Sequence, residues 1–138
     1  MSARLVLSLP PSVNNWLRVG KTGKIYKTAV AKEWAMEAVL LAQNWRQRTG
    51  WTPTHQQKIV ADYWIWWPDL KSRDPSNLEK VLWDALEGIV YDNDRWVLPR
   101  CQDFAVDWQR PRVELEFWVK DYLKRRGRQD NELILPAH

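Results

Sequence analysis

The feature that most constrains the fold is the segment at residues 58–67, which reads KIVADYWIWW and is closed by Pro68. It is rich in branched and aromatic residues, and near its end it is apolar on both alternating faces, which is typical of a central strand covered on two sides. A chain of 138 residues has room for one compact core around such a strand. We therefore expect a single domain at residues 1–120, followed by a basic tail at residues 121–138.

Two amphipathic helices and several shorter strands are expected around this segment. Apolar residues recur at three- and four-residue spacing from residue 29 to residue 48, and Thr28 is placed to cap this helix. A second helix is expected at residues 77–86. The fold class is thus α/β (α+β), with a mixed sheet of about four strands, two packed helices and an N-terminal basic hairpin or loop. The other strands are expected at residues 4–9, 101–108 and 113–120, the last two forming a closing hairpin, and the basic hairpin at residues 13–26, with its tip near residues 20–23.

Charge is distributed unevenly along the chain, whose formal net charge is +4. Two basic segments, at residues 18–32 and 120–128, flank a locally acidic segment at residues 69–103 with eight acids and five bases. A phosphodiester-cleaving protein needs cations on the backbone phosphates and carboxylates on a metal ion. The same pattern also fits ordinary solvated surface charge, so charge alone does not establish the function.

The residues with the strongest chemical pattern lie along and beside the second helix. Asn77, Lys80 and Asp84 follow one another at i, i+3 and i+7, so they project from the side opposite to the apolar stripe. Asp74 precedes the helix, and the turn at residues 92–94 follows it. Phosphodiester hydrolysis needs a hard divalent cation held by oxygen ligands, and a nearby lysine can fix the phosphate. The alternative is a surface ion pair between Lys80 and Asp84 beside ordinary turn residues.

The order of these motifs resembles that of the RusA-like family of Holliday junction resolvases. The family shares a Pro-Pro-Ser-x-Asn segment, here residues 10–14, which is followed by Trp16 and a basic hairpin. It also carries Asp-x-Asp-Asn-x-x-Lys, here residues 74–80, and a later acidic pair that falls on residues 93–94. The resemblance covers about residues 5–120 and is specific because several motifs agree in order.

The resemblance implies a set of site residues and partners. The first Asp of the central motif and the last residue of the later pair, here Asp74 and Asp94, bind Mg²⁺, and Mn²⁺ is expected to substitute. The motif lysine, Lys80, is needed for cleavage, and Asn77 and Asp84 match positions that shape the site. The expected substrate is branched DNA, a four-way junction, cut to leave a 5′-phosphate and a 3′-hydroxyl. Because two strands are cut across a two-fold branch point, we expect a homodimer with one site per subunit.

Two carboxylates of the family pattern are absent from this chain. Ser76 stands where the central motif usually has its second aspartate, and Asn93 occupies the first position of the later pair. Ser76 and Glu79 instead have the spacing of a capping box at a helix start. Asp84 or Asp92 would supply the missing negative charge, and Ser76 would contribute at most a hydroxyl ligand. The alternative is a relative that binds junctions without cutting them.

Residues expected to contact DNA lie mainly in the early basic segment. The chain has eleven tryptophans, and indole rings can stack on unpaired bases. Trp34, Trp45, Trp64 and Trp66 lie in expected helices or strands and are assigned to the core. The predicted DNA-binding residues are Asn14, Trp16, Arg18, Lys21, Lys24, Lys27 and Arg73.

Other protein classes and the cellular setting are judged from what the sequence lacks. A nuclease of the PD-(D/E)xK class would need an Asp followed by a strand-borne Glu-x-Lys, which we do not find. An interaction domain with an incidental acidic turn stays open, and it predicts no metal effect on stability and no salt-dependent DNA binding. The single cysteine, Cys101, is expected to pack in the core, in a reducing compartment. Without a signal peptide pattern or a membrane segment, the protein is expected in the cytoplasm.

Overall fold

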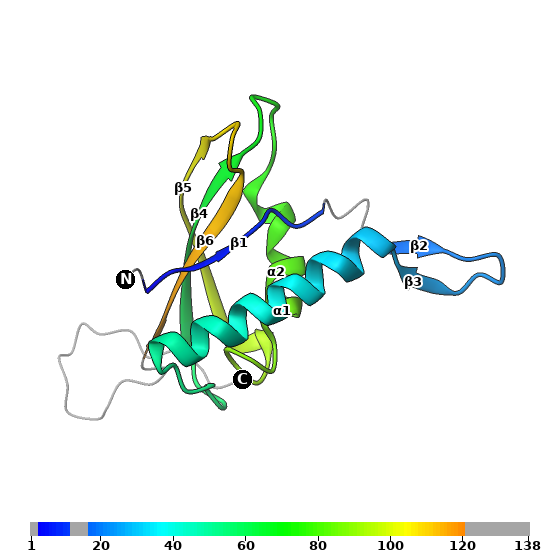
Figure 1. The fold of residues 1–138 in the computed structure, drawn as a ribbon. Coiled ribbons are helices and arrows are strands. Elements are labelled where there is room, and N and C mark those ends of the chain that lie inside the picture. Colours follow the sequence, from blue (N-terminus) through cyan, green and yellow to red (C-terminus); the bar gives the residue numbers. More distant parts are fainter. Residues whose placement is uncertain (1–2, 12–16, 121–138) are drawn as a thin grey trace, which may run out of the picture.

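Two sheets and two helices make up the part of the chain that the computed structural model describes, residues 3–11 and 17–120. The elements are β1 (Leu5–Leu7), β2 (Leu17–Val19), β3 (Ile25–Lys27), α1 (Ala29–Thr49), β4 (Ile59–Trp67), the 3-10 turn η2 (Pro75–Leu78), α2 (Glu79–Leu86), the 3-10 turn η3 (Asp94–Trp96), β5 (Val97–Val106) and β6 (Arg112–Val119). The larger sheet has the order β1-β6-β4-β5, and the hairpin β2–β3 projects beyond the N-terminal end of α1 (Figure 1). The predicted α+β class, with a mixed four-stranded sheet and two helices, is confirmed. The predicted tail at residues 121–138 lies outside the described residues.

Strand β4 occupies the centre of the larger sheet, as its sequence predicts. It pairs in parallel with β5, beginning with Ile59 opposite Val97, and antiparallel with β6. The predicted closing hairpin between the last two strands is wrong, because β4 lies between them and forms a ladder with each. The connection from β5 to β6 instead passes the end of β4, where the backbone N–H of Asp107 donates to the carbonyl of Trp67 at 2.9 Å.

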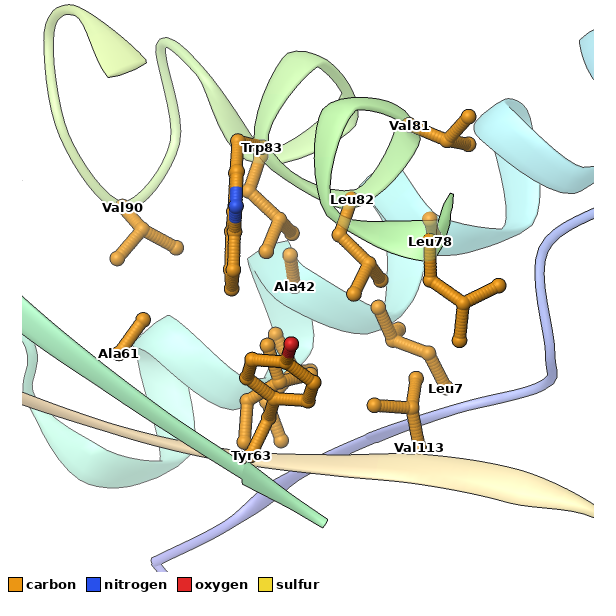
Figure 2. Packing of buried hydrophobic residues seen from close by; sticks show 14 of the residues in the cluster. Leu7, Ala42, Ala61, Tyr63, Leu78, Val81, Leu82, Trp83, Val90 and Val113 are labelled. Atoms are coloured by element: carbon orange, nitrogen blue, oxygen red, sulfur yellow. The ribbon is translucent and has the colours of Figure 1, made fainter. Parts of the chain in front are cut away.

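Both helices pack against one face of this sheet and bury the core with it (Figure 2). Thr28 caps α1 as predicted, because its hydroxyl accepts the N–H of Ala31 at 3.2 Å. The cluster joins Tyr63 of β4 to Ala42 of α1 and Leu82 of α2. It also contains the two α1 tryptophans assigned to the core, Trp34 and Trp45.

Leu82 offers a direct test of this core. Its side chain is fully buried, whereas Leu70 is 80% exposed. Truncation of a buried leucine removes transfer free energy and leaves a cavity, so Leu82→Ala should lower the free energy of unfolding by about 3 kcal/mol. Guanidinium unfolding measures this loss, with Leu70→Ala as the matched control that should change it by less than about 0.5 kcal/mol. Equal losses in the two variants would contradict the packing.

The opposite face of β4 is covered by arginine side chains, so the prediction of a strand covered on two sides by packed elements is confirmed for one face only. The Arg4 guanidinium lies 3.7 Å from the ring centroid of Trp64, and that of Arg112 lies 4.0 Å from the centroid of Trp66. These two tryptophans are half-buried rather than part of the core, and they gain cation–π contacts instead. Cys101, which was expected to pack in the core, is exposed on the edge strand β5.

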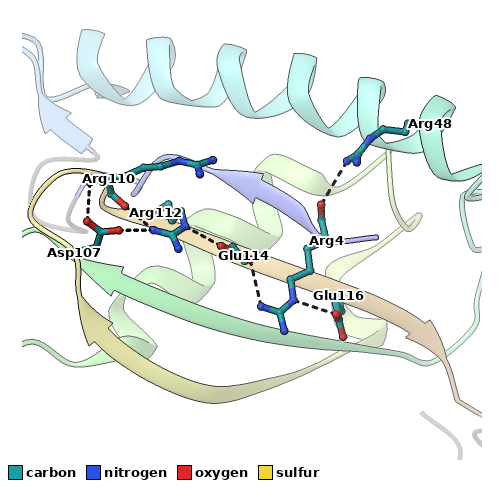
Figure 3. A network of polar contacts seen from close by, with 7 residues as sticks. All are labelled: Arg4, Arg48, Asp107, Arg110, Arg112, Glu114 and Glu116. Carbon is teal, nitrogen blue, oxygen red and sulfur yellow. Dashed lines mark hydrogen bonds and ion pairs between the residues drawn. The ribbon is translucent and has the colours of Figure 1, made fainter. Parts of the chain in front are cut away.

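Glu114 links the arginines of this face (Figure 3). Its carboxylate accepts from Arg4 at 3.2 Å and from Arg112 at 2.7 Å, while Arg4 also donates to Glu116 at 3.1 Å. Partial burial opposes ionisation, but the hydrogen bonds and charges of Arg112 and Arg4 outweigh it and lower the pKa of Glu114. The ionised carboxylate therefore stabilises the folded state.

Glu114→Gln should lower the free energy of unfolding by about 1 kcal/mol at neutral pH. Because the folded-state pKa is lowered, this contribution is present above the ordinary glutamate pKa and is lost as the pH falls through the folded-state value. Urea unfolding at pH 7 and in acid measures both, and the difference from the unmodified protein should shrink in acid. Glu116→Gln, which removes a more exposed carboxylate with one arginine partner, should have a smaller effect. A loss that is the same at both pH values would count against the ionic origin.

Candidate active site

Asp74 stands at the entrance to the helical region that carries the candidate site. Its backbone is extended, and it directly precedes the 3-10 turn η2. Its Oδ1 accepts the N–H of Ser76 at 3.0 Å, and its carbonyl accepts the N–H of Asn77 at 3.0 Å. The exposed carboxylate is thus held in place through one oxygen, and the capping position explains why the chain turns here.

Ser76 does not cap α2, so the predicted capping box is wrong. The region opens with a 3-10 turn, and Asp74 caps it two residues earlier than the serine. The carboxylate of Glu79 accepts the hydroxyl of Tyr63 at 2.6 Å instead of returning to the helix start, and α2 has no side-chain cap. The Ser76 side chain is exposed next to Asp74.

The polar stripe of α2 faces away from the core, as predicted. Asn77, Lys80 and Asp84 are exposed, whereas Leu82 and Leu86 on the other side are buried. The Nζ of Lys80 lies 3.7 Å from Oδ2 of Asp84, and the lysine side chain is 81% exposed. Such an exposed pair contributes little to stability. Lys80 can therefore exchange this partner for a phosphate at small cost.

The carboxyl group of Asp94 lies close to that of Asp84. Partial burial raises the pKa of Asp84, and so do a hydrogen bond to the Asp94 carboxyl group and the negative charges of Asp94 and Glu87; Lys80 acts in the opposite direction. Two neighbouring carboxylates repel each other unless a proton or a cation lies between them. This arrangement suits a hard divalent cation, whose preferred ligands are carboxylate oxygens.

Glu87 is a site residue that the sequence analysis missed. It directly follows the last residue of α2, and its Oε1 accepts the backbone N–H of Asp94 at 2.9 Å. It thereby fixes the turn that carries Asp94. Burial raises the pKa of the Tyr91 phenol, and the negative charges of Asp94, Glu87 and Asp84 raise it further. No periodic signal in the sequence indicated it, because Glu87 lies just beyond the end of α2 and its backbone is extended.

Asp92 is engaged in a different part of the molecule. Its Oδ2 accepts the N–H of Gln56 at 3.0 Å and lies 3.0 Å from Nδ1 of His55. Asn93 caps η3, and its side-chain oxygen accepts the N–H of Arg95 at 3.0 Å. Asparagine and aspartate are about equally good caps. The amide therefore keeps this local role at a position where the family pattern has an acid.

The predicted residues thus form two groups on one helical region. Asp84, Asp94 and Lys80 form the first, and Asp74 with Ser76 and Asn77 forms the second. Within residues 3–11 and 17–120, no three His, Cys, Asp or Glu side chains are grouped closely enough to hold a metal ion by themselves. The donors that are present are hard oxygens, which fit Mg²⁺.

The predicted DNA-binding residues fall in two places. Arg73 lies beside Asp74 at a depression of about 450 Å³, where it donates to Asp69 at 2.6 Å and lies over the Trp67 ring at 5.2 Å. The hydrogen bond from Arg73 lowers the pKa of Asp69 to about 2. The other predicted contacts belong to the basic hairpin and the segment before it: Lys21, Lys24 and Lys27 are exposed, whereas Asn14, Trp16 and the side chain of Arg18 lie outside the described residues.

Adjacent carboxylates and a lysine on an exposed helix face, with a basic hairpin at the end of the neighbouring helix, are the parts of a small phosphodiester-cleaving enzyme. The family model described as endodeoxyribonuclease RusA matches residues 9–117, and the chain belongs to this family. Membership supports a Holliday junction resolving endonuclease in general, one that acts on branched DNA. A comparison with the curated proteins finds no match. No helix of the described part is long and apolar enough to cross a membrane.

Proposed function

We propose that this chain is a Mg²⁺-dependent, structure-selective endodeoxyribonuclease that resolves Holliday junctions by paired symmetric incision in DNA recombination and repair. The observation that supports this most is the proximity of the Asp84 and Asp94 carboxyl groups, with Lys80 beside Asp84 on the exposed face of α2. A purely structural surface would pair acids with bases, because adjacent acids destabilise the fold. Membership in the RusA family supports branched DNA as the substrate.

Asp84 and Asp94 would hold the cation in this proposal, and Asp74, which belongs to the second group, would complete the site only when the cation and the DNA are bound. All three offer carboxylate oxygens, which Mg²⁺ prefers and Mn²⁺ also accepts. When bound, such a cation supplies charge neutralisation at the scissile phosphate and helps to deprotonate the attacking water. Asp84 takes over the charge that the family pattern places at Ser76, whereas Asp92 keeps its role in the loop at residues 55–56.

The remaining residues orient the substrate and the ligands. Lys80 donates to a phosphate oxygen and stabilises the additional negative charge of the transition state. The Glu87 carboxylate positions Asp94 by accepting the backbone N–H of Asp94. The backbone N–H of Ser76 positions Asp74 by donating to its carboxylate. We expect the products to carry a 5′-phosphate and a 3′-hydroxyl. Paired incision needs two such sites, so we propose a two-fold homodimer with one site in each subunit.

Cleavage of a labelled synthetic four-way junction tests this function. With Mg²⁺ or Mn²⁺, the protein should nick two opposing strands at symmetric positions and leave a linear duplex of the same sequence intact. EDTA should abolish the reaction, and DNA ligase should reseal the products because their ends are a 5′-phosphate and a 3′-hydroxyl. Junction binding without nicking, unchanged by Asp74→Asn, would refute the nuclease proposal.

A junction-binding protein without catalysis is the second candidate, and the replaced acids at Ser76 and Asn93 favour it. Thermal unfolding with and without Mn²⁺ separates the two candidates. A cation that binds the folded state raises the melting temperature, and Asp94→Asn should remove most of that rise. A protein without a metal site would melt at the same temperature under both conditions.

A further inference from the structure

We propose that Val19 and Ile25, at the tip of the basic hairpin, form an apolar wedge that enters between unstacked bases at the branch point of the junction. This inference deepens the proposed function and depends on it for the identity of the substrate. It gives a specific role to two side chains that the cleavage site does not use.

The two residues form the last cross-strand pair before the turn. Val19 lies opposite Ile25 in the antiparallel ladder of β2 and β3, so both side chains leave the same face of the hairpin. The turn is closed by hydrogen bonds from the N–H of Gly20 to the carbonyl of Lys24 at 2.7 Å and from the N–H of Gly23 to the carbonyl of Gly20 at 3.0 Å. The apolar pair therefore stands at the tip.

This tip is open to solvent and extends away from the body of the domain. Val19 is 69% exposed and Ile25 is 64% exposed. The hairpin is an isolated two-stranded sheet that continues beyond the end of α1 (Figure 1). Such a hairpin has little stability by itself, and an exposed branched pair at its tip adds nothing to the core. The pair is placed to contact another molecule.

Charge identifies that molecule as a polyanion. Lys21, Lys24 and Lys27 are exposed around the apolar pair, and the sequence has no acid before Glu33. A second copy of the same hairpin would bring like charges together, whereas DNA would neutralise them. Apolar side chains, isoleucine among them, are known to enter base steps as wedges, and the cost of unstacking opposes this insertion. When a junction is open, its arms no longer stack across the branch point, so the same insertion costs less there than in a continuous duplex.

The hairpin is joined by a single residue to the helix that packs beside the candidate cleavage site. Thr28 alone separates β3 from α1, and it caps this helix. Helix α1 is 21 residues long and packs against α2, which carries Lys80 and Asp84. Because α1 is a continuous helix, a wedge at the hairpin tip would set the distance between the branch point and the position of the cut.

The test replaces the pair by threonines, which are polar but also branched at Cβ. Val19→Thr/Ile25→Thr keeps both β-branched side chains and all three lysines, and Val30→Thr, at an exposed valine on α1, is the matched control. Binding is measured with Ca²⁺ in place of Mg²⁺, using a junction with 2-aminopurine at the branch point and a linear duplex of the same sequence. The unmodified protein and the control should raise the 2-aminopurine fluorescence. The double variant should lose this rise and bind the junction roughly tenfold more weakly, with duplex affinity unchanged.

Three results would overturn the wedge. The first is an unaltered fluorescence rise and junction affinity in the double variant, and the second is an equal loss of affinity for junction and duplex. The third is a smaller sedimenting mass of the double variant than of the unmodified protein, which would assign the pair to contact with a second copy. None of these measurements requires strand cutting. If the unmodified protein nicks the junction but shows no fluorescence rise, the wedge proposal is refuted and the nuclease proposal is not. If it shows the fluorescence rise but does not nick the junction, only the nuclease proposal is refuted.

Discussion

Asp94→Asn should lower the rate of junction cleavage by roughly 10³-fold, while the affinity for the junction stays within about threefold of that of the unmodified protein. The substitution keeps the size of the side chain and removes a negative charge from the pair with Asp84. A divalent cation then loses a ligand, and with it several kcal/mol of transition-state stabilisation. Single-turnover cleavage with saturating Mg²⁺ measures the rate, and fluorescence anisotropy with Ca²⁺ measures binding.

Asp92→Asn is the matched control, because it makes the same chemical change two residues away. Asp92 accepts a hydrogen bond from Gln56 and lies against His55, so its replacement should loosen that loop and leave the cleavage rate within about threefold. A loss of rate as large in Asp92→Asn as in Asp94→Asn would show that the turn as a whole, rather than the Asp84–Asp94 pair, is needed. An active Asp94→Asn protein would refute the proposed site.

Lys80→Met should lower the cleavage rate by roughly 10²- to 10³-fold with little change in junction affinity. The lysine is 81% exposed and 3.7 Å from Asp84, so folding does not depend on it. Its ammonium group would act where charge develops on the phosphate, and methionine keeps the aliphatic length without the charge. The measurement is the single-turnover rate at saturating protein, with the melting temperature as a check on the fold.

Two lysine controls separate catalysis from binding. Lys71→Met, in the exposed loop before Asp74, should leave the rate unchanged. Lys21→Met, at the hairpin tip, should weaken DNA binding and reduce the salt dependence of affinity by about one unit of slope, without changing the rate at saturation. A Lys80→Met protein that only binds more weakly would place this lysine among the phosphate contacts and outside the catalytic step.

The electrostatics of α2 indicate why the site is not optimised for stability. Asp84 has a raised pKa in the folded protein, so its ionised form is disfavoured by folding at neutral pH. The pair Arg4–Glu114 shows the opposite arrangement on the outer face of the sheet, where arginines lower the pKa of the acid. The acids near Asp84 suit a ligand of positive charge, whereas the pairing of Glu114 with arginines stabilises the folded chain itself.

Local patterns in the sequence determined several elements and the polar stripe of the site. The spacing of apolar residues predicts the C-terminal end of α1 to within one residue. The cap at Thr28 is also predictable, because a capping side chain bonds to a backbone N–H only three residues further along the chain. The turn at residues 20–23 and the exposed face of α2 follow from the same short-range rules. The family motif also lies within a short stretch of chain, so its order can be recognised without a structure.

Only the tertiary structure decided which distant groups meet. Ladder partners are not specified by a strand's own sequence, so the insertion of β4 between β5 and β6 could not be predicted from the short connection at residues 107–111. The guanidinium groups over Trp64 and Trp66 belong to Arg4, just before β1, and to Arg112 of β6. The sequence around the two tryptophans does not reveal this cover, so they were assigned to the core. The path of the backbone after α2 brings Asp94 close to Asp84 and directs the Asp92 side chain towards Gln56. The sequence by itself determined which acids were available, and the packing of that turn decided which of them share a site.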